Sequence, residues 1–73
     1  MKTWTIYEVQ FRDAGTFSGT IMGLPVDVLD PTCARVAAHG NGTGFEQAAN
    51  ADAAIVSYTV INTVEVGDNE CPL

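Results

Sequence analysis

The side chains best suited to nucleophilic or metal chemistry in this 73-residue sequence are two cysteines and one histidine. A thiol nucleophile needs a neighbouring imidazole base, and His39 is the only histidine that could serve Cys33. If the segment that holds both residues is helical, their separation along the chain corresponds to about 600° of rotation, so the two side chains point in different directions. A zinc site needs closely spaced ligand pairs, which Cys33, His39 and Cys71 do not provide. We therefore expect neither an enzyme nor a bound cofactor or metal.

The two cysteines leave two redox states open. A disulfide between Cys33 and Cys71 would close a loop of roughly 40 residues and add about 4 kcal/mol of stability. The N-terminal residues, however, enter a strand-like alternation rather than an apolar signal peptide, and cytoplasmic thiols stay reduced. We expect a cytoplasmic protein with two free thiols, and a secreted, disulfide-stapled domain is the alternative.

Charge is the most informative global property. Nine acidic residues face three basic ones, which gives a net charge of −6. Nucleic acids and anionic membranes both require cationic side chains, so neither is an expected partner. The acidic charge either keeps a small protein soluble or forms a surface that docks on a basic partner protein.

Four carboxylates are the candidates for such a docking surface, because they could converge near the starts of two predicted helices. These residues are Asp27, Asp30, Glu46 and Asp52. Trp4 shares a strand face with charged residues, so it either packs into the core or anchors a partner.

Strand-like alternation is strongest in residues 54–66. The even positions carry a mostly apolar row, which predicts a long central strand that buries Val56, Tyr58, Val60, Val64 and Val66. Asn62 interrupts this row and predicts a bend, a bulge or an end to the core at that level. At the other end of the chain, residues 3–12 predict a strand with one buried face, made of Thr5, Tyr7, Val9 and Phe11. Trp4 and Ile6 lie on its other face, so the N-terminal half of that face must also be either covered or sticky.

Residues 13–15 predict a short hairpin connection to a second strand over residues 16–24. Pro25 ends that strand, and residues 26–28 could continue it along an edge of the sheet. After Val66, the polar residues 67–73 predict a loosely held C-terminal tail.

The middle of the chain permits two structures. Asp30-Pro31 is a helix-start signal for a helix that ends near Ala38, and Thr43 begins a capping-box pattern for a second helix that buries Phe45, Ala48 and Ala49. Alternatively, residues 35–39 and 43–47 form a hairpin, which would give an all-β, five-stranded small barrel. Because alanine dominates both segments, we favour helices. The predicted fold is a single α+β domain over residues 1–73, with an antiparallel sheet of three or more strands and one or two short helices in the order β-β-α-(α)-β.

The segments WTIYEVQF, GTFSGTIMGL and DPTCARVAAHG, read as β-β-α in a small acidic chain, resemble phage-encoded inhibitors of the anti-CRISPR type. This resemblance implies a non-enzymatic protein in the host cytoplasm that occludes a nucleic-acid or subunit-docking surface of a CRISPR effector complex. Anti-CRISPR proteins do not form one family, so no functional residue is carried over from the resemblance. From the residues alone, a small structural subunit that oligomerises through a sheet edge or through the Trp4 and Ile6 face is the alternative function.

Overall fold

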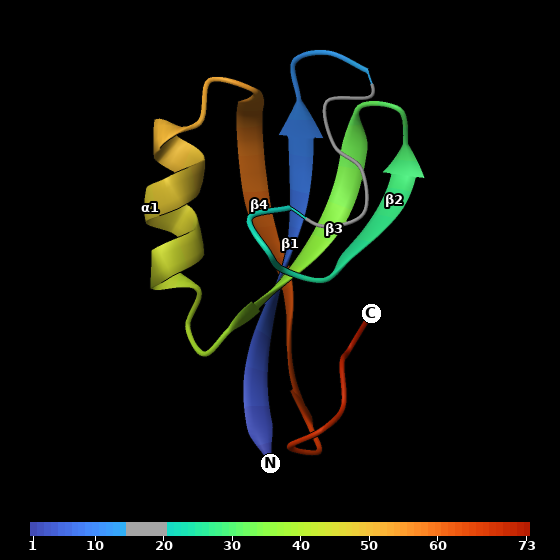
Figure 1. Cartoon of the computed structure of the whole chain (residues 1–73), viewed down its shortest axis with the longest axis vertical. Helices are drawn as coiled ribbons and strands as arrows, with labels where there is room; N and C mark the ends of the chain where they lie inside the picture. Colours follow the sequence, from blue (N-terminus) through green and yellow to red (C-terminus); the bar gives the residue numbers. More distant parts are fainter. Residues whose placement is uncertain (15–20) are drawn as a thin grey trace.

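The computed structural model describes residues 1–14 and 21–73, which form a four-stranded antiparallel sheet and one α-helix (Figure 1). In chain order the elements are β1 (Lys2–Phe11), β2 (Val26–Asp30), β3 (Cys33–His39), α1 (Thr43–Ala51) and β4 (Ile55–Val66). The strand order across the sheet is β2-β3-β1-β4. The prediction of a small α+β domain is therefore confirmed, with a single helix among the described residues.

Strand β1 lies in the middle of the sheet and supplies much of the core. Its alternation buries Thr5, Tyr7, Val9 and Phe11 on one face, which we call the core face, so the predicted pattern of the first strand is confirmed. Tyr7 pairs with Val36 in register, which places Ala34, Val36 and Ala38 of β3 on the same face. Small alanines on β3 leave room on that face for larger side chains from elsewhere in the chain.

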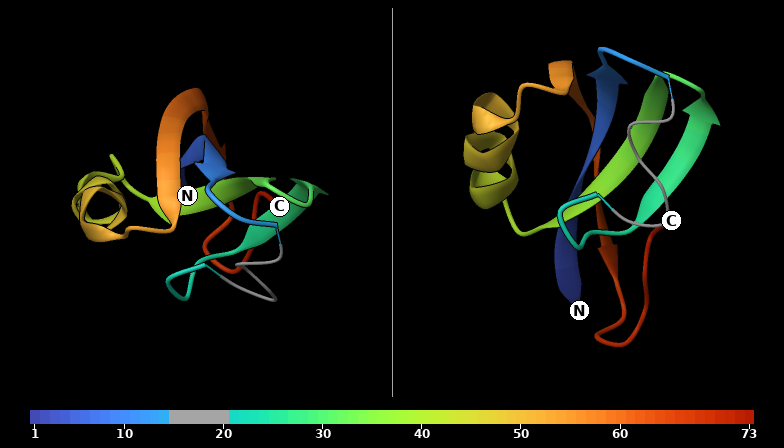
Figure 2. Two further views of the ribbon diagram at one scale, coloured as in Figure 1. Left: turned by 90° about the horizontal axis from the view of Figure 1, so that it is seen from above. Right: turned by 45° about the horizontal axis from the view of Figure 1, so that its top comes forward.

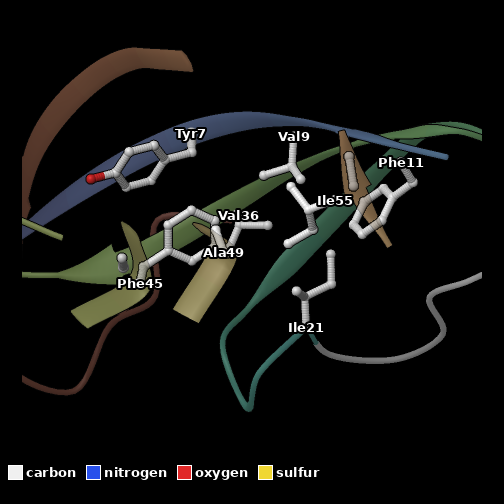
Figure 3. Close-up of a cluster of buried hydrophobic side chains, with 10 residues drawn as sticks. Tyr7, Val9, Phe11, Ile21, Val36, Phe45, Ala49 and Ile55 are labelled. Atoms are coloured by element: carbon white, nitrogen blue, oxygen red, sulfur yellow. The ribbon is translucent and has the colours of Figure 1, made fainter. Parts of the chain in front are cut away.

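Helix α1 covers the core face through two residues, Phe45 and Ala49 (Figure 3). The rings of Tyr7 and Phe45 stack with centroids 4.6 Å apart, and Tyr58 meets both rings edge-on. This predicted helix is confirmed, although Ala48 is exposed. The predicted capping box does not form, because Gly42 is the N-cap residue and has φ 76°. A Cβ at Gly42 would lie 2.1 Å from the Tyr7 hydroxyl oxygen, so only glycine fits there.

The predicted helix from Pro31 to Ala38 is wrong, because this segment contains β3. The Asp30 carboxylate accepts hydrogen bonds from the Thr32 backbone N–H (2.8 Å) and hydroxyl (3.1 Å), so it stabilises the turn between β2 and β3 instead of starting a helix. Strand β3 pairs with β1 on one side and β2 on the other, which outweighs the modest helix preference of alanine. The alternative hairpin was right about 35–39 but wrong about 43–47, where α1 lies. The described residues therefore do not form the five-stranded barrel.

Strand β4 occupies its predicted position, but it is an edge strand and not the centre of the sheet. Val56 and Val60, expected in the core, are 59% and 51% exposed. Among the described residues, β4 pairs with β1 alone. It is β1, between β3 and β4, that lies inside the sheet. Two register shifts leave Val56 and Ile61 without a directly paired β1 residue, so the bulge predicted at Asn62 is confirmed at its neighbour.

Residues 16–20 of the strand predicted over 16–24 lie outside the described residues. Its described end is a tight turn, with a bridge between Ile21 and Leu24 and positive φ at Met22 and Gly23. The edge strand predicted after Pro25 is confirmed as β2.

The sheet face opposite the core is also covered in its lower half, the first of the two predicted alternatives. Trp4 and Ile6 are 5% and 7% exposed. Pro72 and Leu73 line a hollow together with Ile6, so the chain after β4 folds back over this face (Figure 2). Asp68 forms an ion pair with the N-terminal amine of Met1 (3.3 Å). The looseness of residues 67–73 stays a prediction.

Candidate partner-docking surface

Three aspartates lie at one end of the sheet, at the top of Figure 1, and we call this region the acidic end. It consists of Asp13, Asp30 and Asp52, all of which are exposed. Two backbone hydrogen bonds bring the three turns together. The Phe11 N–H donates to the Thr32 carbonyl (2.8 Å) and the Arg12 N–H donates to the Ala54 carbonyl (2.9 Å). The end of β1, just before Asp13, is therefore hydrogen-bonded on one side to the turn that carries Asp30. On the other side it is hydrogen-bonded to the turn that carries Asp52.

Two of these carboxylates are fixed by their own turns. Asp30 accepts from Thr32, as described above, and one Asp52 oxygen accepts from the Ala54 backbone N–H (2.9 Å). Such local bonds hold an aspartate in one place without a folded core around it. The charges of Asp30 and Asp52 therefore have defined positions relative to the sheet.

The four predicted docking residues do not converge as expected. Asp30 and Asp52 lie at the acidic end, but Asp27 lies on β2, where it forms an ion pair with Arg35. Glu46 lies in the first turn of α1, at the other end of the helix from Asp52. The prediction relied on two helix starts, and one of them does not exist.

Glu46 is partly buried and its charge acts on the core residue Tyr7. Burial raises the pKa of the Tyr7 phenol, and the negative charge of Glu46 raises this pKa further. The protonated phenol donates to the Asn41 carbonyl (3.4 Å). Glu46 thus acts locally on a core tyrosine, which makes it a poorer docking residue than the aspartates of the acidic end.

Trp4 does not offer an exposed anchor. Its ring packs against the His39 ring, with centroids 3.9 Å apart, and only 5% of the residue is exposed. Of the two roles left open by the sequence, the structure supports core packing.

The thiols show no geometry for nucleophilic chemistry. Both cysteines are free, with Cys33 buried in β3 and Cys71 exposed near the C-terminus, so no disulfide joins them. The Cys33 thiol donates to a Glu8 carboxylate oxygen (3.6 Å). Burial raises the pKa of Cys33, and the charges of Glu8 and Asp30 raise it further, which keeps this thiol protonated. His39 stands at the opposite end of β3, roughly 20 Å along the strand, so it cannot act as a base for Cys33.

The described residues contain no group of three or more potential ligands that could hold a metal ion. Nor does the described part of the chain include a helix of the length and hydrophobicity needed to cross a membrane. Comparisons with family models, with curated proteins and with solved structures each gave no match.

Sequence reasoning missed Asp13 as a docking residue. Asp13 follows a strong strand directly, and a turn aspartate at a strand end is exposed as a rule. Only the register of β1 against β3 and β4, however, shows which other turns lie beside it.

Proposed function

We propose that this protein is a non-enzymatic binding module whose acidic end docks on a basic surface of a partner protein. The observation that carries the proposal is the grouping of Asp13, Asp30 and Asp52 at one end of the sheet, in a chain of net charge −6. A concentrated negative surface attracts a basic partner over distance and accelerates association. Carboxylates that are already held by turn hydrogen bonds lose little side-chain freedom on binding.

The partner class follows from chemistry and from the resemblance described above. Proteins that bind nucleic acids present grooves rich in Lys and Arg, and the guanidinium group of Arg pairs well with carboxylates. An acidic module can occupy such a groove and exclude the nucleic acid. We therefore propose a phage or mobile-element inhibitor that acts on a CRISPR effector complex.

The test compares two variants with the same net charge. One variant replaces Asp13, Asp30 and Asp52 with Asn, which removes the charge while the amide oxygen can still accept the turn hydrogen bonds. The matched control replaces Glu46, Glu65 and Glu70 with Gln. Binding to purified CRISPR effector complexes, with and without nucleic acid, is measured by biolayer interferometry.

We expect the association rate of the aspartate variant to fall by about tenfold at low salt, with a smaller change in the control. Bound nucleic acid should compete with the wild-type protein. Equal losses in both variants would assign the effect to net charge alone, and unchanged binding in the aspartate variant would refute the acidic end as the docking surface.

The exposed edge of β4 favours a second candidate function, a small subunit that forms oligomers. The secreted, disulfide-stapled domain is not proposed, because Cys33 is buried against Glu8 while Cys71 is exposed.

A further inference from the structure

We propose that the lower half of β4, Val60–Val66, pairs in antiparallel orientation with the same segment of a second copy of this chain. The two sheets then join into one continuous sheet around a two-fold axis at Thr63. The pairing segment lies in the half of β4 that is remote from the acidic end (Figure 1). This inference deepens the second candidate function, the oligomer-forming subunit, and does not depend on docking of the acidic end.

The lower half of β4 is an exposed edge. Among the described residues, β4 has β1 as its one strand neighbour, so its other side carries no strand. Helix α1 contacts β4 and flanks its upper half, whereas the lower half extends beyond the helix (Figures 1 and 2). Val60 and Ile61, where the half beyond the helix begins, are 51% and 44% exposed. Pro72 and Leu73 line a hollow with Ile61, Val64 and Val66 and so lie over one face of this half.

The hydrogen-bond pattern of β1 shows which backbone groups of β4 point outward. Odd residues of β1 bond toward β3, since the Phe11 N–H donates to Thr32 and the Thr3 carbonyl accepts from Gly40. Thr5 belongs to this odd set and pairs in register with Thr63. The N–H and carbonyl of Thr63 therefore point away from β1, to the outer side of the sheet.

The outward N–H of Thr63 has an acceptor from a neighbouring side chain. It donates to the amide oxygen of Asn62 (2.9 Å). A carbonyl of an added strand can replace this local acceptor, and the Asn62 side chain then returns to water. The edge thus offers an outward donor that a strand can use at little cost.

A second copy fits this edge better than a flexible peptide does. The segment is already a strand in each copy, so pairing does not have to order a disordered chain. Thr63 opposite Thr63 exchanges both of its outward hydrogen bonds across a two-fold axis, the commonest symmetry of protein dimers. β-Branched residues, which suit a strand, make up most of the segment, namely Val60, Ile61, Thr63, Val64 and Val66.

The low charge of Val60–Val66 also favours this segment for pairing between two copies. Two copies of net charge −6 repel each other, yet Glu65 is the one charged residue between Val60 and Val66. With Thr63 on the axis, the two Glu65 residues are four residue steps apart, roughly 13 Å along the strands. That separation exceeds the Debye length of about 8–10 Å in physiological salt, so their repulsion is largely screened.

A strand pair of this length lies at the small end of specific interfaces, so we expect a reversible dimer with a micromolar dissociation constant. Sedimentation equilibrium of the full chain over a concentration series tests this. Raising the salt from about 0.05 M to about 0.5 M should strengthen the dimer, because it screens the repulsion between the copies. Docking of the acidic end on a basic partner has the opposite salt dependence, so the two proposals can fail separately.

Two substitutions locate the interface. Thr63→Pro removes an outward N–H that does not bond to β1, so the fold should persist while the dimer is lost. Val60→Lys and Val28→Lys form a matched pair, because both valines are exposed on edge strands, at 51% and 53%. Val60→Lys should raise the dissociation constant by about tenfold or more, and Val28→Lys should leave it unchanged.

A wild-type chain that stays monomeric throughout the series would overturn the proposal, and so would a dimer that Val60→Lys leaves intact. Should Thr63→Pro fail to fold by circular dichroism, the two lysine variants decide the question on their own. Equal weakening by both lysine variants would also overturn it, since added charge would then act without regard to position.

Discussion

The two edge strands of the sheet differ in the features that prevent unwanted strand pairing. Strand β2 has five residues, lies between Pro25 and Pro31, and carries Asp27 and Asp30. Strand β4 has twelve residues, no proline and a single charge, Glu65. Short length, proline and charge all discourage pairing at an edge, while a long strand with few charges invites it. The bulges at Val56 and Ile61 are the main local irregularities of β4.

The two proposals assign different contact regions to these two parts of the sheet. The aspartates of the acidic end would repel a second copy of the chain and attract a basic protein. The lower half of β4 carries a single charge, Glu65, and is the edge that we propose accepts a strand. A dimer formed through β4 would leave both acidic ends exposed, each at the far end of its own sheet.

The largest expected effect tests whether β4 is an edge at all. Val36 is fully buried in β3, so Val36→Asp places an unpaired carboxylate in the core and should cost more than about 4 kcal/mol, enough to unfold the domain. Val60→Asp, at a half-exposed position of β4, should change the free energy of unfolding by only about 1 kcal/mol. Thermal unfolding followed by circular dichroism measures both. An unfolded Val60→Asp variant would place β4 in the centre of the sheet after all.

The burial of β4 could not be predicted from its sequence, because alternation is the same in a central strand and an edge strand. Val56 and Val60 show the period of a buried row, yet their exposure depends on whether another element covers them. The Tyr7 row of β1 was predicted correctly, since it is covered both by its neighbours and by α1. Alternation therefore identified the strands but not their order.

The Ala34, Val36 and Ala38 row of β3 also alternates, and this period could have revealed the strand. The helix preference of alanine and the Asp30-Pro31 signal pointed the other way, and both are weaker than pairing on two sides. For the candidate site, Asp30 and Asp52 were among the four predicted docking residues, and the structure places both at the acidic end. Asp13 could not be grouped with them, because only the register across β1 joins the three turns.

A smaller effect tests which backbone N–H groups of β4 point toward β1 and which point outward. Trp4 belongs to the even residues of β1, which bond toward β4, and it pairs with Val64. Val64→Pro removes an N–H that bonds to β1 and should destabilise the domain by about 3 kcal/mol. Thr63→Pro, one residue earlier, removes an outward N–H and should cost less than about 1 kcal/mol. Urea denaturation of the two variants compares them, and equal losses would contradict the assignment of Thr63 as outward.

The smallest effect concerns the turn that ends β2. Asp30→Ala removes the acceptor for the Thr32 N–H and hydroxyl, so the turn should lose about 1 kcal/mol, as other local capping bonds do. Asp30→Asn keeps an acceptor oxygen and should recover most of that loss while it removes the charge. Urea denaturation separates the structural role from the charge, and partner binding should fall in both variants alike. If Asp30→Asn binds as well as the wild type while Asp30→Ala does not, the position of the turn matters to the partner and the charge of Asp30 does not.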